Sequence, residues 1–256
     1  MTRLIVYNLE YCKGNTGLWW QYLEVWKDFF LPRNLDQRII DHIKKLKPDI
    51  VALVEIDTGS FRSKRGDEPL FFENKLGMKS CAEEYIYGAE GPGRLLKYVP
   101  ILKNHGNAIV SKKKFSEVTH YLLHEGEKRA VIEATIKLKK KVTLLLAHLS
   151  LGEKERSKQI EELIKIVNSI KNPVILMGDF NTFNGEEEIQ KLLDKTHLHH
   201  KFEMDKKSET YTFPSYHPKR RLDYVLTSKG IKVKSYEVLN FHFSDHLPLL
   251  VDFEVK

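Results

Sequence analysis

Several strand-like stretches of this chain end in a polar side chain at the point where the apolar run stops. Asn8 follows the run LIVY, Glu55 follows VALV, and His148 follows LLLA. The other such residues are Asp179 and Asn181 after ILMG, Asp223 within RLDYVL, and the pair Asp245 and His246 before LPLLV. One polar strand end is ordinary, but its repetition predicts that these side chains share one rim.

The pair Asp245 and His246 is the clearest indication of chemistry. Both precede an alternating strand, LLVDFEV, and Pro248 locks the entry to that strand. Burying an aspartate beside a histidine only for packing would cost desolvation energy. We therefore expect this strand end to present both side chains to a charged group.

The side chains of the expected rim form a coherent chemical set. Hard oxygen ligands are offered by Asn8, Glu55, Asp179 and Asp245. With no thiolate among them, these ligands suit Mg²⁺ or Mn²⁺ rather than Zn²⁺. His148 and His246 can donate hydrogen bonds to a phosphate, and Asp223 can fix the tautomer of a histidine and raise its pKa. Neither of the glycine loops that bind nucleotides, GxGxxG or GxxxxGK[ST], occurs in the sequence.

The bulk composition favours one domain over residues 1–256. The chain is 41% hydrophobic and shows neither a repeat nor a linker rich in Gly, Ser or Pro. Its two cysteines indicate no disulfide framework. No apolar run approaches the roughly 18 residues of a membrane-spanning helix, and the first residues do not form a signal peptide. We expect a cytoplasmic monomer without a transmembrane segment.

The net charge of +7 comes from 42 Lys and Arg residues against 35 Asp and Glu residues. This excess favours anionic partners such as phosphates, nucleic acid or an acidic lipid surface. The charged fraction of 30% is also typical of an ordinary solvated surface, so both interpretations stay open.

Hydrophobic periodicity indicates the elements that must position the rim. Strands are predicted at RLIVYN, DIVALVEI, AEEYIYG, GNAIVS, SEVTHYLL, AVIEATIKL, KVTLLLAHLS, PVILMGDF, RLDYVLTS and IKVKSYEVL. Helices are predicted at residues 17–30, 35–46 and 153–170 and at GEEEIQKLLDK. Because hairpin-like neighbours dominate the middle of the chain, we expect two packed mixed sheets with helices outside them.

The first predicted helix, GLWWQYLEVWKDFF, carries an aromatic stripe. The stripe consists of Trp19, Tyr22, Leu23, Trp26 and Phe30 at helical spacing. Such a stripe is typical of a face that packs on the core. Trp20 lies off the stripe and leaves a second interpretation, a lid or an edge that contacts lipid.

Six motifs occur in a fixed order along the chain: VYNLEY, ALVEID, LLLAHLSLG, LMGDFNT, RLDYVL and SDHLPLL. Together they span residues 8–246 and resemble the endonuclease/exonuclease/phosphatase superfamily, also called the deoxyribonuclease-I-like fold. The resemblance implies an α/β fold, a four-layered α/β/β/α sandwich. It also implies a phosphoesterase that depends on Mg²⁺ or Mn²⁺.

The resemblance further implies a metal site. Glu55 would be the principal metal ligand, Asn8 would border the metal and the substrate phosphate, and Asp245 would complete the metal environment. Asp57 could share a strand face with Glu55, although it is more typical of a turn.

The same resemblance implies the catalytic roles. Asp179 would orient or deprotonate the attacking water, while Asn181 and His148 would hold the phosphate. Asp223 would pair with His246. In-line attack builds charge on the equatorial phosphate oxygens, which a divalent cation and a protonated imidazole stabilise. The Asp223 carboxylate favours that protonated state.

The substrate is the least determined part of the prediction. Three functions stay open: a phosphodiesterase or phosphatase acting on a small or lipid-linked phosphate, which we favour, a nuclease, and a non-catalytic phosphate-binding module. Relatives that cut abasic DNA often carry a tryptophan just before the RLDY strand, whereas ETYTFPSYHPKRRLDY has none. The basic tract 219–221 is either a clamp for extra phosphates or a solvated turn. Asn107 and Arg129 are further, weaker candidates for substrate contact.

Overall fold

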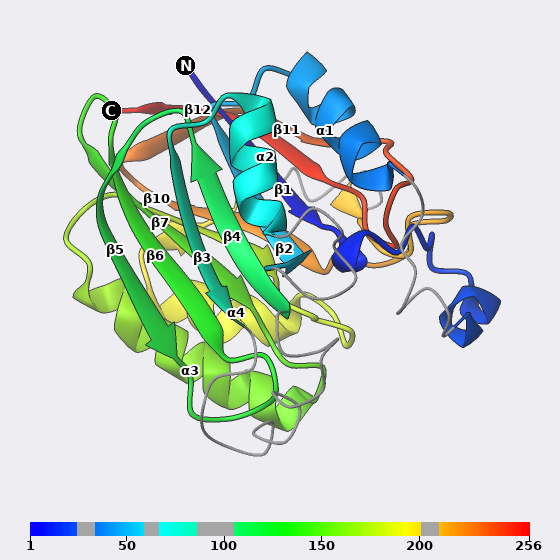
Figure 1. The fold of residues 1–256 in the computed structure, drawn as a ribbon. Helices are drawn as coiled ribbons and strands as arrows, with labels where there is room; N and C mark the ends of the chain where they lie inside the picture. Colours follow the sequence, from blue (N-terminus) through cyan, green and yellow to red (C-terminus); the bar gives the residue numbers. More distant parts are fainter. Residues whose placement is uncertain (25–33, 59–66, 86–104, 201–209) are drawn as a thin grey trace.

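The computed structural model describes residues 1–24, 34–58, 67–85, 105–200 and 210–256 (Figure 1). The first sheet has the strand order β11-β12-β1-β2-β4-β3, with β1 Thr2–Asn8, β2 Ile50–Asp57, β3 Ser80–Tyr85, β4 His105–Ser111, β11 Ile231–Val238 and β12 Leu249–Val255. The second has the order β5-β6-β7-β8-β10-β9, with β5 Phe115–Leu122, β6 Ala130–Lys137, β7 Lys141–His148, β8 Val174–Asp179, β9 Leu198–His199 and β10 Asp223–Ser228. The helices are α1 Leu35–Lys45, α2 Glu68–Leu76, α3 Glu153–Ser169 and α4 Glu187–Lys195, with 3-10 turns η1 Glu10–Cys12 and η2 Trp19–Leu23.

Alternation along the central strands builds the layers. In β1, Leu4 and Val6 join the core between the two sheets, together with Ile132 and Met177 of the second sheet. Side chains of successive strand residues point to opposite faces, so Ile5 of β1 enters a different core. The inner layer is therefore a dry interface between two sheets.

Helices cover both outer faces, α1 and α2 on one side and α3 and α4 on the other (Figure 1). Ile39 of α1 and Phe72 of α2 pack with Ile5 on the outer face of the first sheet. Leu163 of α3 packs with Leu145 of β7 on the outer face of the second sheet. The predicted four-layered α/β/β/α sandwich is confirmed.

The two sheets have the same sequence of pairings. Each contains one parallel pair at its centre, β1 with β2 and β7 with β8, flanked by antiparallel neighbours. Parallel neighbours need a crossover, which α1 supplies in the first sheet and α3 in the second. The carboxyl ends of each parallel pair therefore lie at one edge of their sheet.

The segment around Trp19 corrects one prediction. In the described part of the predicted helix, residues 17–24, the structure has the short 3-10 turn η2, and Trp19, Trp20 and Leu23 are 76%, 47% and 69% exposed. The interpretation of the stripe as core is wrong for Trp19 and Leu23. Trp26 and Phe30 lie outside the described residues.

Helix α2 was not predicted from the sequence. Its apolar residues Leu70, Phe71 and Phe72 are consecutive and do not show helical spacing. Local chemistry starts and ends it instead: the Asp67 side chain accepts a hydrogen bond from the Leu70 N–H, and Gly77 follows in the left-handed conformation. No described helix is long and apolar enough to cross a membrane.

Candidate active site

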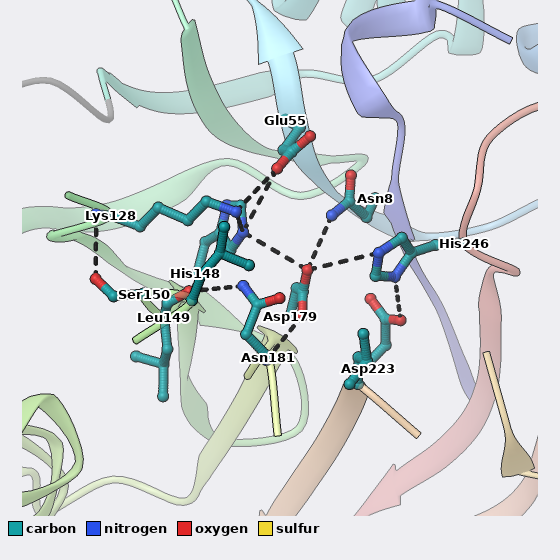
Figure 2. Close-up of polar contacts among 12 residues, drawn as sticks. Asn8, Glu55, Lys128, His148, Leu149, Ser150, Asp179, Asn181, Asp223 and His246 are labelled. Carbon is teal, nitrogen blue, oxygen red and sulfur yellow. Dashed lines mark hydrogen bonds and ion pairs between the residues drawn. The ribbon is translucent and has the colours of Figure 1, made fainter. Parts of the chain in front are cut away.

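One carboxylate, Asp179 at the end of β8, lies at the centre of the gathered polar residues (Figure 2). Its Oδ2 accepts a hydrogen bond of 3.0 Å from Asn8 Nδ2 of β1. The same oxygen lies 3.5 Å from His148 Nε2 and 3.8 Å from His246 Nε2. Asp179 therefore contacts side chains delivered by both sheets.

Strand register places the neighbours of Asp179. His148 is its partner in the parallel pair β7–β8, and Asp223 is its partner in the antiparallel pair β8–β10. The preceding residue, Gly178, has a φ of 132°, and a Cβ there would lie 1.9 Å from the Ala147 carbonyl oxygen. Glycine is therefore needed for the close approach of these two strands.

Asn181 fastens the loop that follows Asp179. Its N–H donates to Asp179 Oδ1 at 2.9 Å, and its side-chain amide donates to the Leu149 carbonyl at 2.7 Å. The residue has a φ of 50°, in the left-handed region that asparagine tolerates better than most residues. The amide thus links the loop after β8 to the loop after β7.

His246 and Asp223 form a buried pair beside Asp179. His246 Nδ1 lies 2.7 Å from Asp223 Oδ2. Burial opposes the charged imidazole, but the carboxylates of Asp223 and Asp179 outweigh it and hold the pKa of His246 well above its usual range. The imidazolium donates through Nδ1 to Asp223 and directs Nε2 toward Asp179.

The pKa of Asp179 is raised to about 6, first by burial and also by the nearby Asp223, although His246 opposes the shift. Asp179 therefore changes its charge closer to neutral pH than an exposed aspartate does. A carboxylate with such a pKa suits proton transfer near neutral pH.

Glu55 is aimed by an irregularity in β2. The β2–β4 pairing shifts register between Leu53 and Ile56, and Glu55 has a φ of 52°. The fully buried Asn107 of β4 accepts a hydrogen bond of 3.2 Å from the Glu55 N–H. A β-bulge changes the direction of a side chain, and the hydrogen bond to Asn107 holds the backbone of Glu55 in the bulged conformation.

Lys128 is a member of the cluster that the sequence interpretation missed. Its Nζ lies 3.1 Å from Glu55 Oε1 and 2.6 Å from His148 Nε2 (Figure 2). Burial acts to lower the pKa of Lys128, but the charges of Glu55 and Asp179 raise it overall. The neighbouring basic residue Arg129, which the sequence suggested, points a guanidinium toward the His124 carbonyl at 3.5 Å.

The contact with Lys128 determines the state of His148. A charged ammonium can only donate, so His148 Nε2 must accept and the ring proton must lie on Nδ1. Burial and the positive charges of Lys128 and His246 hold the pKa of His148 well below its usual range. His148 is therefore a neutral acceptor.

Glu10 is the second residue that the sequence interpretation missed. It follows Asn8, whose Oδ1 accepts the Glu10 N–H at 3.0 Å. Glu10 Oε1 accepts a bond of 2.6 Å from Asn15, but Oε2 is buried without a hydrogen-bond partner among the described residues. Burial and the carboxylates of Asp245 and Glu55 raise the pKa of Glu10 to about 9.

The group of Glu10, Glu55 and Asp245 fits a divalent cation. All three donors are carboxylates, one oxygen is orphaned, and their charges oppose one another. A hard cation would satisfy the orphaned oxygen and offset the repulsion. Asp57, the other carboxylate considered on β2, is buried, with its N–H bonded to Glu68 of α2.

A second group of donors could also hold a metal ion. Asp179, Asp223 and His246 offer ligand atoms within 4.8 Å of one another. Here the imidazole is already engaged with Asp223, so a cation would have to compete with the proton of His246. Among the described residues there are thus two candidate donor groups for a cation, and Asp179 belongs to the second.

A sequence model of the Endonuclease/Exonuclease/phosphatase family matches residues 8–246. The UPF0294 protein of Yersinia enterocolitica is 29% identical over 144 residues, which cover 55% of this chain and 48% of that protein. The match therefore spans about half the length of this curated relative.

Solved structures share the fold at low sequence identity. The human Nocturnin catalytic domain with bound sulfate anion superposes with a TM-score of 0.70 at 22% identity, covering 100% of this chain and 93% of that one. A mannosyl-6-phosphatase of Bacteroides thetaiotaomicron gives 0.69 at 16% identity, with 99% and 100% coverage. Likeness at these identities shows the fold alone.

Proposed function

Since this chain belongs to the endonuclease/exonuclease/phosphatase family, whose members are hydrolases acting on phosphoester bonds, we propose that it is a divalent-metal-dependent phosphodiesterase or phosphatase. One observation carries the proposal. The Asp179 carboxylate lies between a protonated His246 and the neutral His148, close to the carboxylates of Glu10, Glu55 and Asp245. This arrangement provides a base, a hydrogen-bond donor and a cation site at one point.

In the proposed reaction, Asp179 accepts a proton from a water molecule as that water attacks phosphorus. The ester P–O bond breaks as the new bond forms, and the leaving oxygen takes a proton from solvent and departs as an alcohol. His246, kept charged by Asp223, donates through Nε2 to a phosphoryl oxygen as its negative charge grows. A divalent cation held by Glu10, Glu55 and Asp245 would polarise the phosphoryl group. We assign Mg²⁺ or Mn²⁺ on the basis of the all-oxygen donor set.

Lys128 and the two asparagines complete the proposed mechanism. The Lys128 ammonium, held between Glu55 and His148, adds a second positive charge for a phosphate oxygen. Asn8 fixes Asp179 Oδ2, and Asn181 fixes the other oxygen through its backbone N–H. Both contacts restrict the carboxylate to one orientation, which favours proton transfer.

The non-catalytic binding module is disfavoured because every motif position keeps a chemically competent side chain. A nuclease acting on DNA is the main alternative within the family. Among the relatives, one neighbour is a mannosyl-6-phosphatase, which supports a phosphatase, and the curated relative carries no activity in its name.

The test is a substrate panel with added Mg²⁺ or Mn²⁺. It contains a bis-aryl phosphodiester, an aryl phosphomonoester, plasmid DNA, an abasic-site duplex and single-stranded RNA. Each assay includes Asp179→Asn and the control Asp194→Asn, which changes an exposed carboxylate bonded to Gln190. We expect activity that Asp179→Asn loses and Asp194→Asn keeps. No hydrolysis of any substrate, or full activity in Asp179→Asn, would refute the proposal.

A further inference from the structure

The basic tract 219–221 divides into two different environments. Arg221 is buried, forms an ion pair of 2.9 Å with Glu186, and donates to the Thr210 hydroxyl at 2.8 Å. These contacts give it a structural task. Arg220 is exposed, and its guanidinium carbon lies 5.3 Å from the centroid of the Phe183 ring. Only Lys219 and Arg220 are therefore available to an anion.

Aromatic rings connect Arg220 to the catalytic imidazole. The half-buried Phe213 ring lies 5.0 Å from the His246 ring and 5.9 Å from the Phe183 ring. Phe183 follows Asn181 by two residues in the chain. The order from the reacting centre outward is an imidazole, two phenyl rings and a guanidinium.

The backbone fixes this row in place. Phe213 and Arg220 pair with each other, N–H to carbonyl, at 3.0 and 2.9 Å. The loop is tied to the segment that carries His246, because the Leu247 N–H donates to the Thr212 carbonyl at 2.8 Å. Phe213 therefore keeps its position relative to His246 without a ligand.

We propose that Phe183, Phe213 and Arg220 form a subsite for a nucleotide unit adjoining the scissile phosphate. A base stacks against the phenyl wall, and the guanidinium of Arg220 binds the next phosphate along the strand. Arginine presents a planar fork of donors that matches a phosphate, and its cation already lies on an aromatic face. This inference rests on the proposed metal-dependent hydrolysis of a phosphodiester and, among the substrates left open above, selects a phosphodiester between nucleotides, the substrate of the nuclease alternative.

The positive charge beside the Phe183 and Phe213 rings argues against a lipid-linked substrate at these rings. Both rings are half-buried, and the Phe183 ring is partly covered by the Arg220 cation. An acyl chain gains most from a broad apolar surface without charge. A nucleobase is planar, needs only one ring face, and is followed by a phosphate at its own sugar.

The experiment compares the dinucleotide TpT with forms carrying an added 5′ or 3′ phosphate and with a dinucleotide lacking one base. A bis-aryl phosphodiester serves as the reference without a second phosphate. The variants are Arg220→Gln and Phe213→Leu, with Lys219→Gln as the matched control for removing one exposed charge. Kinetics are measured for each variant, and binding of every dinucleotide is measured on Asp179→Asn carrying the same changes.

We expect an added phosphate to raise kcat/KM about 10-fold in the wild type and in Lys219→Gln. We expect this gain to be absent in Arg220→Gln. We expect Phe213→Leu to raise KM about 10-fold for TpT, with a smaller change for the dinucleotide lacking the base. Both changes should reduce kcat/KM less on the reference diester, which lacks the second phosphate and the base, than on the dinucleotides.

The outcomes separate the two proposals. Hydrolysis of the reference diester without any gain from an added phosphate would overturn the subsite and leave the proposed function intact. The subsite would also be overturned if Lys219→Gln and Arg220→Gln lost the gain from the added phosphate equally. It would be overturned as well if a variant lost kcat/KM equally on every substrate. If no substrate is hydrolysed, the proposed function fails, and the binding measurements still decide the subsite.

Discussion

The two sheets deliver their polar residues to the candidate site in different ways. In the second sheet, His148, Asp179 and Asp223 face each other in regular strand register. In the first sheet, Glu55 lies at a register shift with a φ of 52°, and residues 10–12 after β1 have φ values of 45°, 53° and 56°. The same topology thus ends in a regular half, whose strand register at the site is unbroken although Asn181 is left-handed, and an irregular half, whose register is shifted.

The difference indicates a division of tasks. The regular half holds a carboxylate, a neutral histidine and the partner of His246 at positions that the strand pairing already fixes. The irregular half gathers Glu10 and Glu55 near Asp245, although their charges repel. Unusual backbone conformations persist at sites where the surroundings compensate for them, and the proposed cation would supply such compensation here.

Asp223→Asn should have the largest effect, because it removes the charge that keeps His246 protonated and oriented. We expect kcat to fall ~10²–10⁴-fold with little change in metal affinity. Steady-state kinetics and metal titration by calorimetry check the two parts. A loss of metal affinity as large as the loss of kcat would show that the regular half also holds the cation.

Glu55→Gln should give the opposite pattern. We expect the affinity for Mg²⁺ or Mn²⁺ to weaken ~10–100-fold, and high metal concentration to restore most of the activity. Asp57→Asn, on the same strand, is the matched control. Unchanged metal affinity in Glu55→Gln would remove the first sheet from the cation site.

Asn107→Ala tests whether the bulge in β2 aims Glu55. Its side-chain oxygen accepts the Glu55 N–H, so its loss should weaken metal affinity about 10-fold without removing a ligand. Thermal unfolding is measured alongside, since Asn107 is fully buried. A drop in melting temperature with normal metal affinity would limit Asn107 to a packing role.

The smallest expected effect is a pH dependence of metal stabilisation. The folded-state pKa of Glu10 is raised to about 9, above its ordinary value of 4.5, so without metal the stability falls as pH rises between those values. A cation offsets that loss, so Mg²⁺ should raise Tm more at pH 8.5 than at pH 6. The difference in Tm should be about 2–4 °C for each kcal/mol by which the cation stabilises the folded protein more at pH 8.5 than at pH 6. In Glu10→Gln this pH difference should disappear.

Much of the fold and part of the cluster could be predicted because strand ends leave a local signature. A polar residue that terminates an apolar run is visible in sequence, which is how Asn8, His148 and Asp179 were found. Lys128 and Glu10 lie in segments without periodicity. In such segments the sequence does not indicate which of two adjacent basic residues, Lys128 or Arg129, directs its side chain into the cluster. That direction depends on the local backbone conformation, which tertiary contacts determine.

The exposed Trp19 shows a second limit. Helical spacing of aromatic residues does not determine whether a helix forms or which partner covers it. The single domain, the monomeric state and the cytoplasmic location stay predictions from composition.

The glycine of the GDFN motif sets the clearance between the two central strands of the second sheet. Because a β-carbon at Gly178 would lie 1.9 Å from the Ala147 carbonyl oxygen, any other residue would force β7 and β8 apart. Such a wedge would separate His148 from Asp179 while leaving every catalytic side chain intact. The positions at which this protein tolerates no substitution therefore extend beyond its reactive groups.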